Sequence, residues 1–204
     1  MKWIPLVLSA AVAVGYARAA TFICDPQRGS PLGDGSDAKP WRTIEEVLAA
    51  RLVRLTDADG RTANPDAPVR PGDTVLLRTG WHGILRIPTG YHAQTFTLAA
   101  EDGQTPQLGW IEIREGSNWT LRGLTVSPSL APEPLGRTPR QLVTLGEHGG
   151  AASSNLVVEG CFLFSTLDTS AWTARDWIDK PASGIGLGRN GRAHIRSEEH
   201  TSEL

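Results

Sequence analysis

Charged and aromatic residues are concentrated in one short segment between residues 172 and 180. Two tryptophans alternate there with two basic and two acidic side chains. Sugar rings pack on the face of tryptophan, and the carboxylates of an acidic sugar pair with Arg or Lys. The segment is therefore the candidate substrate-binding site for a charged polysaccharide. Its members are Trp172, Arg175, Asp176, Trp177, Asp179 and Lys180.

The same residues also allow structural interpretations. Trp172 and Trp177 could pin a loop to the body of the protein, because Trp is often largely buried for packing alone. This interpretation applies more to Trp177 than to Trp172. Lys180 could serve as a general base if burial lowered its pKa. Lysines are seldom buried, so a solvated Lys180 is the favoured interpretation.

Other chemistry is not indicated by the sequence. It has no Gly-x-Ser-x-Gly, Walker A or dinucleotide-binding motif. His82 and His148 lack a second ligand at metal spacing, so neither a metal site nor a cofactor is predicted. The net charge of −2 argues against a nucleic-acid partner, which requires a basic face. Beyond residues 1–19 no apolar run approaches the roughly 20 residues of a membrane span.

The strands that would position this segment repeat along the chain. Ser117–Val126 and Ser154–Leu163 carry Ser, Asn and Gly at the same offsets, with apolar residues matching in between. A period of this size indicates a solenoid, in which each repeat buries its apolar face only against the next. Equivalent positions follow one another at steps of 23, 23, 37 and 37 residues: Val75, Leu98, Leu121, Val158 and Ile195.

Each repeat also carries a second apolar strand, and no helix lies between the strands. Short strands of this kind predict an all-β fold, a parallel β-helix of about four coils over residues 73–195. The frame of a leucine-rich repeat is absent, and a β-sandwich would not repeat its register in this way. The second strands are Ile84–Ile87, Trp110–Ile113, Leu142–Leu145 and Ile185–Leu187.

The two longer steps contain extra loops, at residues 127–140 and 165–182. Both follow the same strand in successive coils, so we expect them to leave the same corner and to stand side by side. Long loops on one face of a solenoid often form its binding face. The second loop carries the candidate site.

Alternation within the strands predicts which side chains point inward. Cys161 takes a core position that Leu124 takes one coil earlier, so a buried free cysteine is favoured over a disulfide with Cys24. Asn118 and Asn155 fall at equivalent corners. Asn tolerates left-handed backbone conformations, and two stacked Asn side chains predict a short structural ladder.

The region before the repeats, residues 20–72, comprises a short strand, one helix and a polar loop. Thr43 and Glu46 form a capping-box pattern, and apolar residues at helical spacing predict a helix from Ile44 to about Leu55. We expect its apolar face to cover the N-terminal end of the β-helix and to shield the first strand edges from water.

Both ends of the sequence read as segments outside the fold. Residues 1–19 have the basic start, apolar stretch and Ala17-Arg18-Ala19 cleavage site of a secretory signal peptide, so a secreted or periplasmic location is expected. Residues 196–204 read as the translation of a DNA adapter used in short-read sequencing. The natural sequence is then expected to stop near Ile195, leaving the last coil less covered and Ile185 and Leu187 more exposed than their counterparts Ile111 and Ile113.

A turn-rich opening, a helix and a Pro-Gly-Asp-Thr-Val strand occur together in the first 80 residues. This combination resembles the N-terminal cap and first coil of bacterial right-handed parallel β-helix proteins of the pectate-lyase-like superfamily. The resemblance rests on Phe22–Pro26, Gly29–Ser30, Gly33–Ser36, Lys39–Thr43 and Pro71–Gly80.

The resemblance implies two functions. The first is a secreted polysaccharide lyase-like enzyme that binds an acidic polysaccharide in a groove and uses a Lys or Arg base, with calcium possible in the full-length protein. No complete catalytic motif of that kind is present, and the catalytic coils are expected to lie beyond this fragment. The alternative is a non-catalytic β-helix, an adhesin or glycan-binding scaffold.

Overall fold

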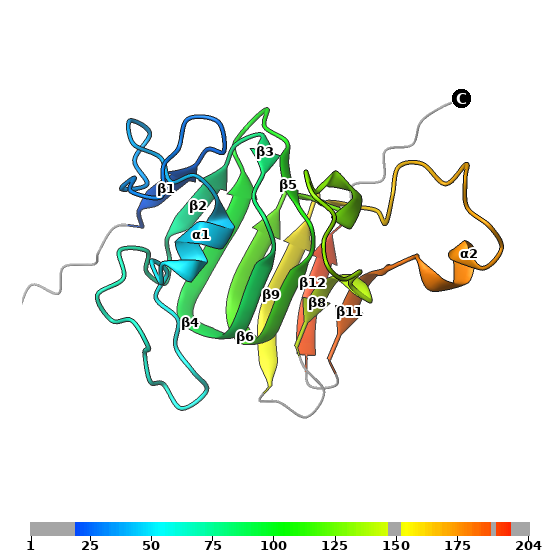
Figure 1. Ribbon diagram of the computed structural model, residues 1–204. Coiled ribbons are helices and arrows are strands. Elements are labelled where there is room, and N and C mark those ends of the chain that lie inside the picture. The colour runs from blue at the N-terminus through cyan, green and yellow to red at the C-terminus, as the bar shows by residue number, and fades with distance from the viewer. Residues whose placement is uncertain (1–18, 147–151, 189–190, 197–204) are drawn as a thin grey trace, which may run out of the picture.

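The computed structural model describes residues 19–146, 152–188 and 191–196 (Figure 1). Residues 1–18 and 197–204, and with them most of the expected signal peptide and tail, lie outside this range. The strands are β1 (Thr21–Cys24), β2 (Thr74–Leu77), β3 (Gly80–Trp81), β4 (Leu85–Ala100), β5 (Pro106–Leu108), β6 (Ile111–Arg122), β7 (Thr125–Val126), β8 (Gln141–Leu145), β9 (Ser153–Glu159), β10 (Phe162–Leu163), β11 (Ser183–Leu187) and β12 (Gly191–Arg196). The helices are α1 (Ile44–Ala49), the 3-10 turn η1 (Pro128–Leu130) and α2 (Asp176–Asp179).

All pairings between these named strands are parallel, and the predicted register is confirmed. Val75 pairs with Leu98, Leu98 with Leu121, Leu121 with Val158, and Val158 with Ile195. β1 adds one more strand, and so one more layer of the stack, before those predicted from the sequence, because Phe22 in β1 pairs with Val75. These strands form row A: β1, β2, the second half of β4, the second half of β6, β9 and β12.

Two further rows, of four strands each, lie beside row A. Row B comprises β3, β5, β7 and β10. Row C comprises the first half of β4, the first half of β6, β8 and β11 (Figure 1). Row C holds the predicted second strands, with Ile111 opposite Val143 and Val143 opposite Ile185. β4 and β6 each run without a break from row C around a corner into row A.

The apolar side chains of the rows fill one core. Val75, Leu98, Leu121 and Val158 are at most 3% exposed, as predicted. At the corner between rows C and A the core is aromatic, with the ring centroid of Trp119 4.7 Å from that of Phe96.

A polar ladder holds the same corner on its outer side. Asn118 and Asn155 have positive φ angles of 59° and 52°, which confirms the predicted left-handed backbone. The Asn155 side-chain amide donates to the Asn118 side-chain oxygen, and the Asn118 amide donates to the main-chain oxygen of His92. The predicted ladder is therefore present and extends one layer further. Cys24 and Cys161 are both free thiols, so the prediction that they form no disulfide is confirmed. Cys161 packs against the core but is only partly buried, and not fully buried as predicted.

The helix begins where predicted but is shorter. The Thr43 hydroxyl accepts a hydrogen bond from the Glu46 amide at 3.2 Å, while the Glu46 carboxylate pairs with Arg42. The prediction that the helix reaches Leu55 is wrong, since it ends at Ala49. Arg51 turns left-handed at φ 57°, and the amides of Arg51 and Leu52 bond back to the carbonyls of Leu48 and Val47. This pair of bonds is a Schellman motif, which closes a helix whatever apolar residues follow.

α1 packs beside β4 at the end of the molecule that carries β1 (Figure 1). Its apolar face points to the core as expected, because Ile44 and Val47 are almost completely buried. The amide of Glu45 donates to the carbonyl of His82, which fixes the helix to the first layer.

The opposite end of the stack is less covered. Ile111 and Ile113 in β6 are fully buried, whereas Ile185 is only partly buried and Leu187 is 45% exposed. The predicted difference between the interior and the last layer is therefore confirmed. Ile195 in β12 is also 53% exposed.

His92 gives a test of the aromatic corner. Its ring stacks on Phe96 and Trp119, neither ring nitrogen has a hydrogen-bond partner among the described residues, and burial lowers its pKa to about 4. Between pH 6.5 and 4 the unfolded chain therefore binds more protons than the folded one, so stability falls as the pH falls through this window. The loss attributable to His92 is at most about 3 kcal/mol.

We predict that His92→Phe raises the free energy of unfolding at pH 7 by about 1 kcal/mol, because it removes two buried unpaired nitrogens. The variant should also lose less stability than the parent between pH 7 and pH 4.5 in urea denaturation. The exposed His194→Gln variant is the control and should keep the parent's pH dependence. A His92→Phe protein that loses as much stability in acid as the parent would contradict the assignment.

Candidate functional site

The six predicted site residues lie together in the loop between β10 and β11. The ring centroids of Trp172 and Trp177 are 4.9 Å apart at an angle of 74°, and the Lys180 ammonium lies 6.0 Å above the Trp172 ring. Arg175 pairs with Asp179 across one turn of α2. The structure thus brings all six into one local cluster.

The charges of this cluster are paired with one another. Lys180 Nζ lies 2.9 Å from the Asp176 carboxylate, and its hydrogen bond, with those from Thr173, lowers the pKa of Asp176 to about 2. Trp177 is 58% exposed, so it does not pin the loop as a buried side chain would. The loop extends away from the stacked strands (Figure 1). Its role in substrate binding stays a prediction.

The two long loops leave the same corner, as expected. One connects β7 to β8 and the other connects β10 to β11, and β7 pairs with β10. The hydroxyl of Ser127 donates to the carbonyl of Ser165 at 3.4 Å, which joins the bases of the two loops.

A second cluster of polar residues lies on the outer face of row C, beside the first of these loops. Arg86, Glu112 and Thr144 occupy one outward position in three successive layers, because Arg86 pairs with Glu112 and Glu112 with Thr144. Arg114 and Arg137 flank Glu112. We call this surface the arginine groove. It is a series of adjoining depressions lined by Arg86, Trp110, Glu112, Arg114, Arg137, Arg140, Gln141 and Thr144.

The groove is positively charged and its parts are fixed. The guanidinium carbons of Arg86 and Arg137 lie 5.1 and 5.2 Å from the centroid of the Trp110 ring. Arg114 Nε donates to Glu112 at 2.8 Å, and Arg137 lies 3.9 Å from the other oxygen of the same carboxylate. Among the described residues, one glutamate, Glu112, lines these depressions together with Arg86, Arg114, Arg137 and Arg140. Such an arrangement can bind a ligand that carries several carboxylates.

Sequence reasoning missed this groove. The aligned second strands contained the signal, since Arg86 lies between the inward Leu85 and Ile87, and Glu112 between Ile111 and Ile113. Reading the outward position of each strand, and not only the inward ones, would have placed Arg86, Glu112 and Thr144 in one line.

Calcium does not fit the groove. Ca²⁺ takes six to eight oxygen ligands, several of them carboxylates. Among the residues that the structure describes, the groove offers one carboxylate, Glu112, which is already held by Arg114 and flanked by Arg137. In the described part of the chain, no three His, Cys, Asp or Glu side chains are grouped so as to hold a metal ion.

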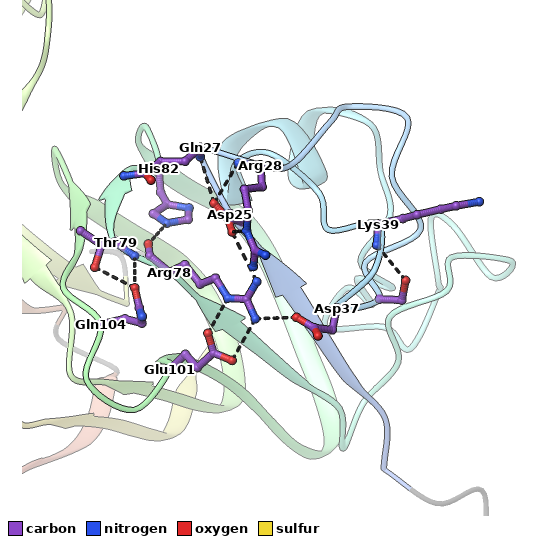
Figure 2. Close-up of polar contacts among 11 residues, drawn as sticks. Asp25, Gln27, Arg28, Asp37, Lys39, Arg78, Thr79, His82, Glu101 and Gln104 are labelled. Atoms are coloured by element: carbon purple, nitrogen blue, oxygen red, sulfur yellow. Dashed lines mark hydrogen bonds and ion pairs between the residues drawn. The ribbon is translucent and has the colours of Figure 1, made fainter.

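A third polar cluster lies where row A turns into row B, and Figure 2 shows its contacts. Asp25, Arg78 and Glu101 are the residues that follow β1, β2 and β4 at the same point of three successive layers. Arg78 pairs with Glu101 at 2.5 Å, with Asp37 at 2.6 Å and with Asp25 at 3.3 Å. Asp25 also accepts hydrogen bonds from the Arg28 side chain and from two amides.

This charge ladder is satisfied internally. The hydrogen bonds that Arg78 donates to Glu101 and Asp37 raise the pKa of its guanidinium group, so Arg78 stays a cation. Burial opposes ionisation of Asp25, but the bonds from Arg28 and its neighbours outweigh it and lower the pKa to about 2. The buried His82 donates through Nε2 to the Arg78 carbonyl at 2.7 Å, and burial lowers its pKa to about 4. One cation shared by three carboxylates favours a structural role over ligand binding.

Comparisons with known proteins return no relative: no family model, no curated protein and no solved structure matches this chain. Within the described residues, no helix has the length and apolar character required to cross a membrane.

We predict that Arg78→Ala lowers the free energy of unfolding by about 3 kcal/mol, because it removes the buried cation shared by Asp25 and Glu101 and leaves Asp25 with only the exposed Arg28. Arg28→Ala is the matched control. Arg28 contacts the same carboxylate, but its side chain is 65% exposed against 14% for Arg78, so its loss should cost less than about 1 kcal/mol. Urea denaturation at pH 7 measures both. Equal losses in the two variants would refute the distinction.

Proposed function

We propose that this protein is a secreted right-handed parallel β-helix of the pectate-lyase-like kind, and that it binds an acidic polysaccharide along the arginine groove. The observation that carries this proposal is the group of arginines on the outer face of row C. Arg86 and Arg114 come from the strands, and Arg137 and Arg140 come from the loop before β8. In the described part of the chain, Glu112 is the one acidic side chain that lines the groove with them. The layers described above are then the coils of the helix. A right-handed winding is the one that nearly all parallel crossovers adopt.

The repeating geometry of the groove favours a polymer as its ligand. Neighbouring parallel strands lie about 4.8 Å apart, so outward side chains recur at that interval along the stack. A chain of uronate sugars also carries one carboxylate per residue, and several weak charge pairs then form together. A single small anion would use only part of such a surface.

Glu112 and Trp110 act as supports for the arginines. Trp110 is almost completely buried and has Arg86 and Arg137 near its ring, so it holds guanidinium groups and does not present an open face to a sugar. Glu112 fixes Arg114 through its hydrogen bond. Arginines held in advance lose less side-chain entropy when a ligand binds.

Binding is better supported than catalysis. Elimination from a uronate requires a base that removes a proton, whereas Arg86, Arg114 and Arg137 contact Trp110 or Glu112 as cations. The non-catalytic glycan-binding scaffold is therefore the first function we propose. The lyase implied by the resemblance is the second, and it would need groups beyond this groove.

The double variant Arg86→Gln/Arg137→Gln should weaken binding to polygalacturonate about 10-fold or more, since it removes two cations from the arginine groove. Calorimetry at 50 mM salt measures the affinity, and added salt should weaken the parent more than the variant. The control is Arg175→Gln in the α2 loop, which should bind as the parent does. If Arg175→Gln loses the binding and the groove variant keeps it, the site is the loop cluster instead.

Incubation with the same polymer separates the two functions. A rise in ultraviolet absorbance from an unsaturated product would establish the lyase, whereas binding without that product supports the scaffold. No binding to any uronate polymer, with the fold intact by circular dichroism, would rule out both.

A further inference from the structure

The first described residues of the chain reach a buried carboxylate. The main-chain nitrogen of Ala20 donates to Asp73 Oδ1 at 2.7 Å, and Asp73 is only 5% exposed. The other oxygen of Asp73 accepts from the amide of Arg70 at 2.7 Å. Asp73 thus ties the point where β1 begins to the point where β2 begins.

Ala20 is fixed in place by a second bond. Its carbonyl accepts from the amide of Thr74 at 2.9 Å, which continues the parallel pairing of β1 with β2 that starts at Thr21. Ala20 itself is exposed to solvent. The nitrogen of Ala20 therefore sits at the edge of the fold with one side toward the carboxylate and another accessible to water.

The sequence places a processing site at this nitrogen. Ala17-Arg18-Ala19 is the expected cleavage motif of the signal peptide, so a signal peptidase would cut between Ala19 and Ala20. Hydrolysis adds one water across the peptide bond, leaving a carboxylate on Ala19 and an amine on Ala20. The amine takes up a proton at neutral pH and becomes an ammonium group.

We propose that Asp73 binds this new N-terminus. Processing replaces the hydrogen bond from the Ala20 amide by a partly buried ion pair between the Ala20 ammonium group and the Asp73 carboxylate, and this pair stabilises the mature protein. The proposal rests on the secretion part of the proposed function and is independent of glycan binding. Asp73 thereby couples removal of the leader to closure of the first layer.

The chemistry favours the processed chain. A charge-assisted hydrogen bond is roughly twice as strong as a neutral one, and the donors to Asp73 among the described residues are the neutral amides of Ala20 and Arg70. A buried carboxylate that gains a hydrogen-bonded cation is the case in which an ion pair is worth most relative to its absence. Because Ala20 stays exposed, the remaining ammonium protons keep their water, and the desolvation cost of the new charge is small.

The pair also predicts a pH dependence. The pKa of an α-amino group is about 8 in an unfolded chain, and an adjacent carboxylate raises it in the folded state. The added stability is then fully present below pH 8 and is lost as the pH rises through the higher folded pKa.

Four proteins test the proposal: the chain 20–204 beginning at Ala20, the same chain with Gly-Ser before Ala20, and the Asp73→Asn variant of each. At pH 6 we expect the chain with the free Ala20 terminus to melt about 3 °C above the extended chain. The difference should vanish at pH 10 and in the Asp73→Asn pair. An exposed Asp66→Asn pair is the control and should keep the difference. Equal melting temperatures of the two parent chains at pH 6 would overturn the proposal.

A second measurement does not depend on stability. The pKa of the Ala20 ammonium, followed by NMR after reductive ¹³C-methylation, should lie above 8 in the mature chain and return toward about 8 in urea. A value at or below 8 in the folded chain would also overturn the proposal. N-terminal sequencing of the exported protein tests the cleavage site separately from the role of Asp73. A start other than Ala20 overturns the processing site, whereas a start at Ala20 without the stability difference overturns the role of Asp73 alone.

Discussion

In-register parallel stacking is the constraint on which the whole molecule depends. A layer of this chain has an apolar inner side that can be buried only by the layers before and after it. The line from Val75 through Leu98 and Leu121 to Val158 meets this need, because each residue lies opposite its equivalent and all are buried. A slip of one residue would turn a whole strand's apolar set outward, so the register is fixed strongly. The same register also aligns the outward-pointing side chains of successive layers.

Three outward lines follow from that alignment, and they have different consequences. Asn118 above Asn155 makes an amide ladder, which satisfies polar groups at a corner where the backbone turns left-handed. Asp25, Arg78 and Glu101 make a ladder of alternating charge, in which each layer neutralises the next. Arg86, Glu112 and Thr144, together with the neighbouring arginines, make a line with excess positive charge. The first two lines hold layers together, and the third belongs to the surface that we propose as the ligand-binding site.

The inward-pointing apolar residues of successive strands could be predicted from the sequence, and the features that could not be predicted have physical causes. Burial forces apolar residues to recur at the period of the layers, so Val75 to Ile195 were found with their pairing. Outward positions such as Arg86 carry no such requirement and show no periodic signal. The layer of β1 was missed because the long segment before β2 hides the step. The end of α1 was missed because a left-handed Arg51 closes the helix, although Leu52 and Leu55 continue the apolar pattern. The α2 cluster was found because its members are close in sequence.

The two arginine-rich sites differ in how their charges are balanced. Arg78 is surrounded by Asp25, Asp37 and Glu101, so its charge is more than balanced, and removing it would leave buried charge behind. In the arginine groove, by contrast, several cations lie around one carboxylate of the described residues, that of Glu112. Cations this close repel one another, and their contacts with Trp110 and Glu112 hold them in place. A bound polyanion would reverse that repulsion. The balance of charge among the described residues is therefore the physical difference between the two sites, and it is the reason for proposing the arginine groove as the ligand-binding surface.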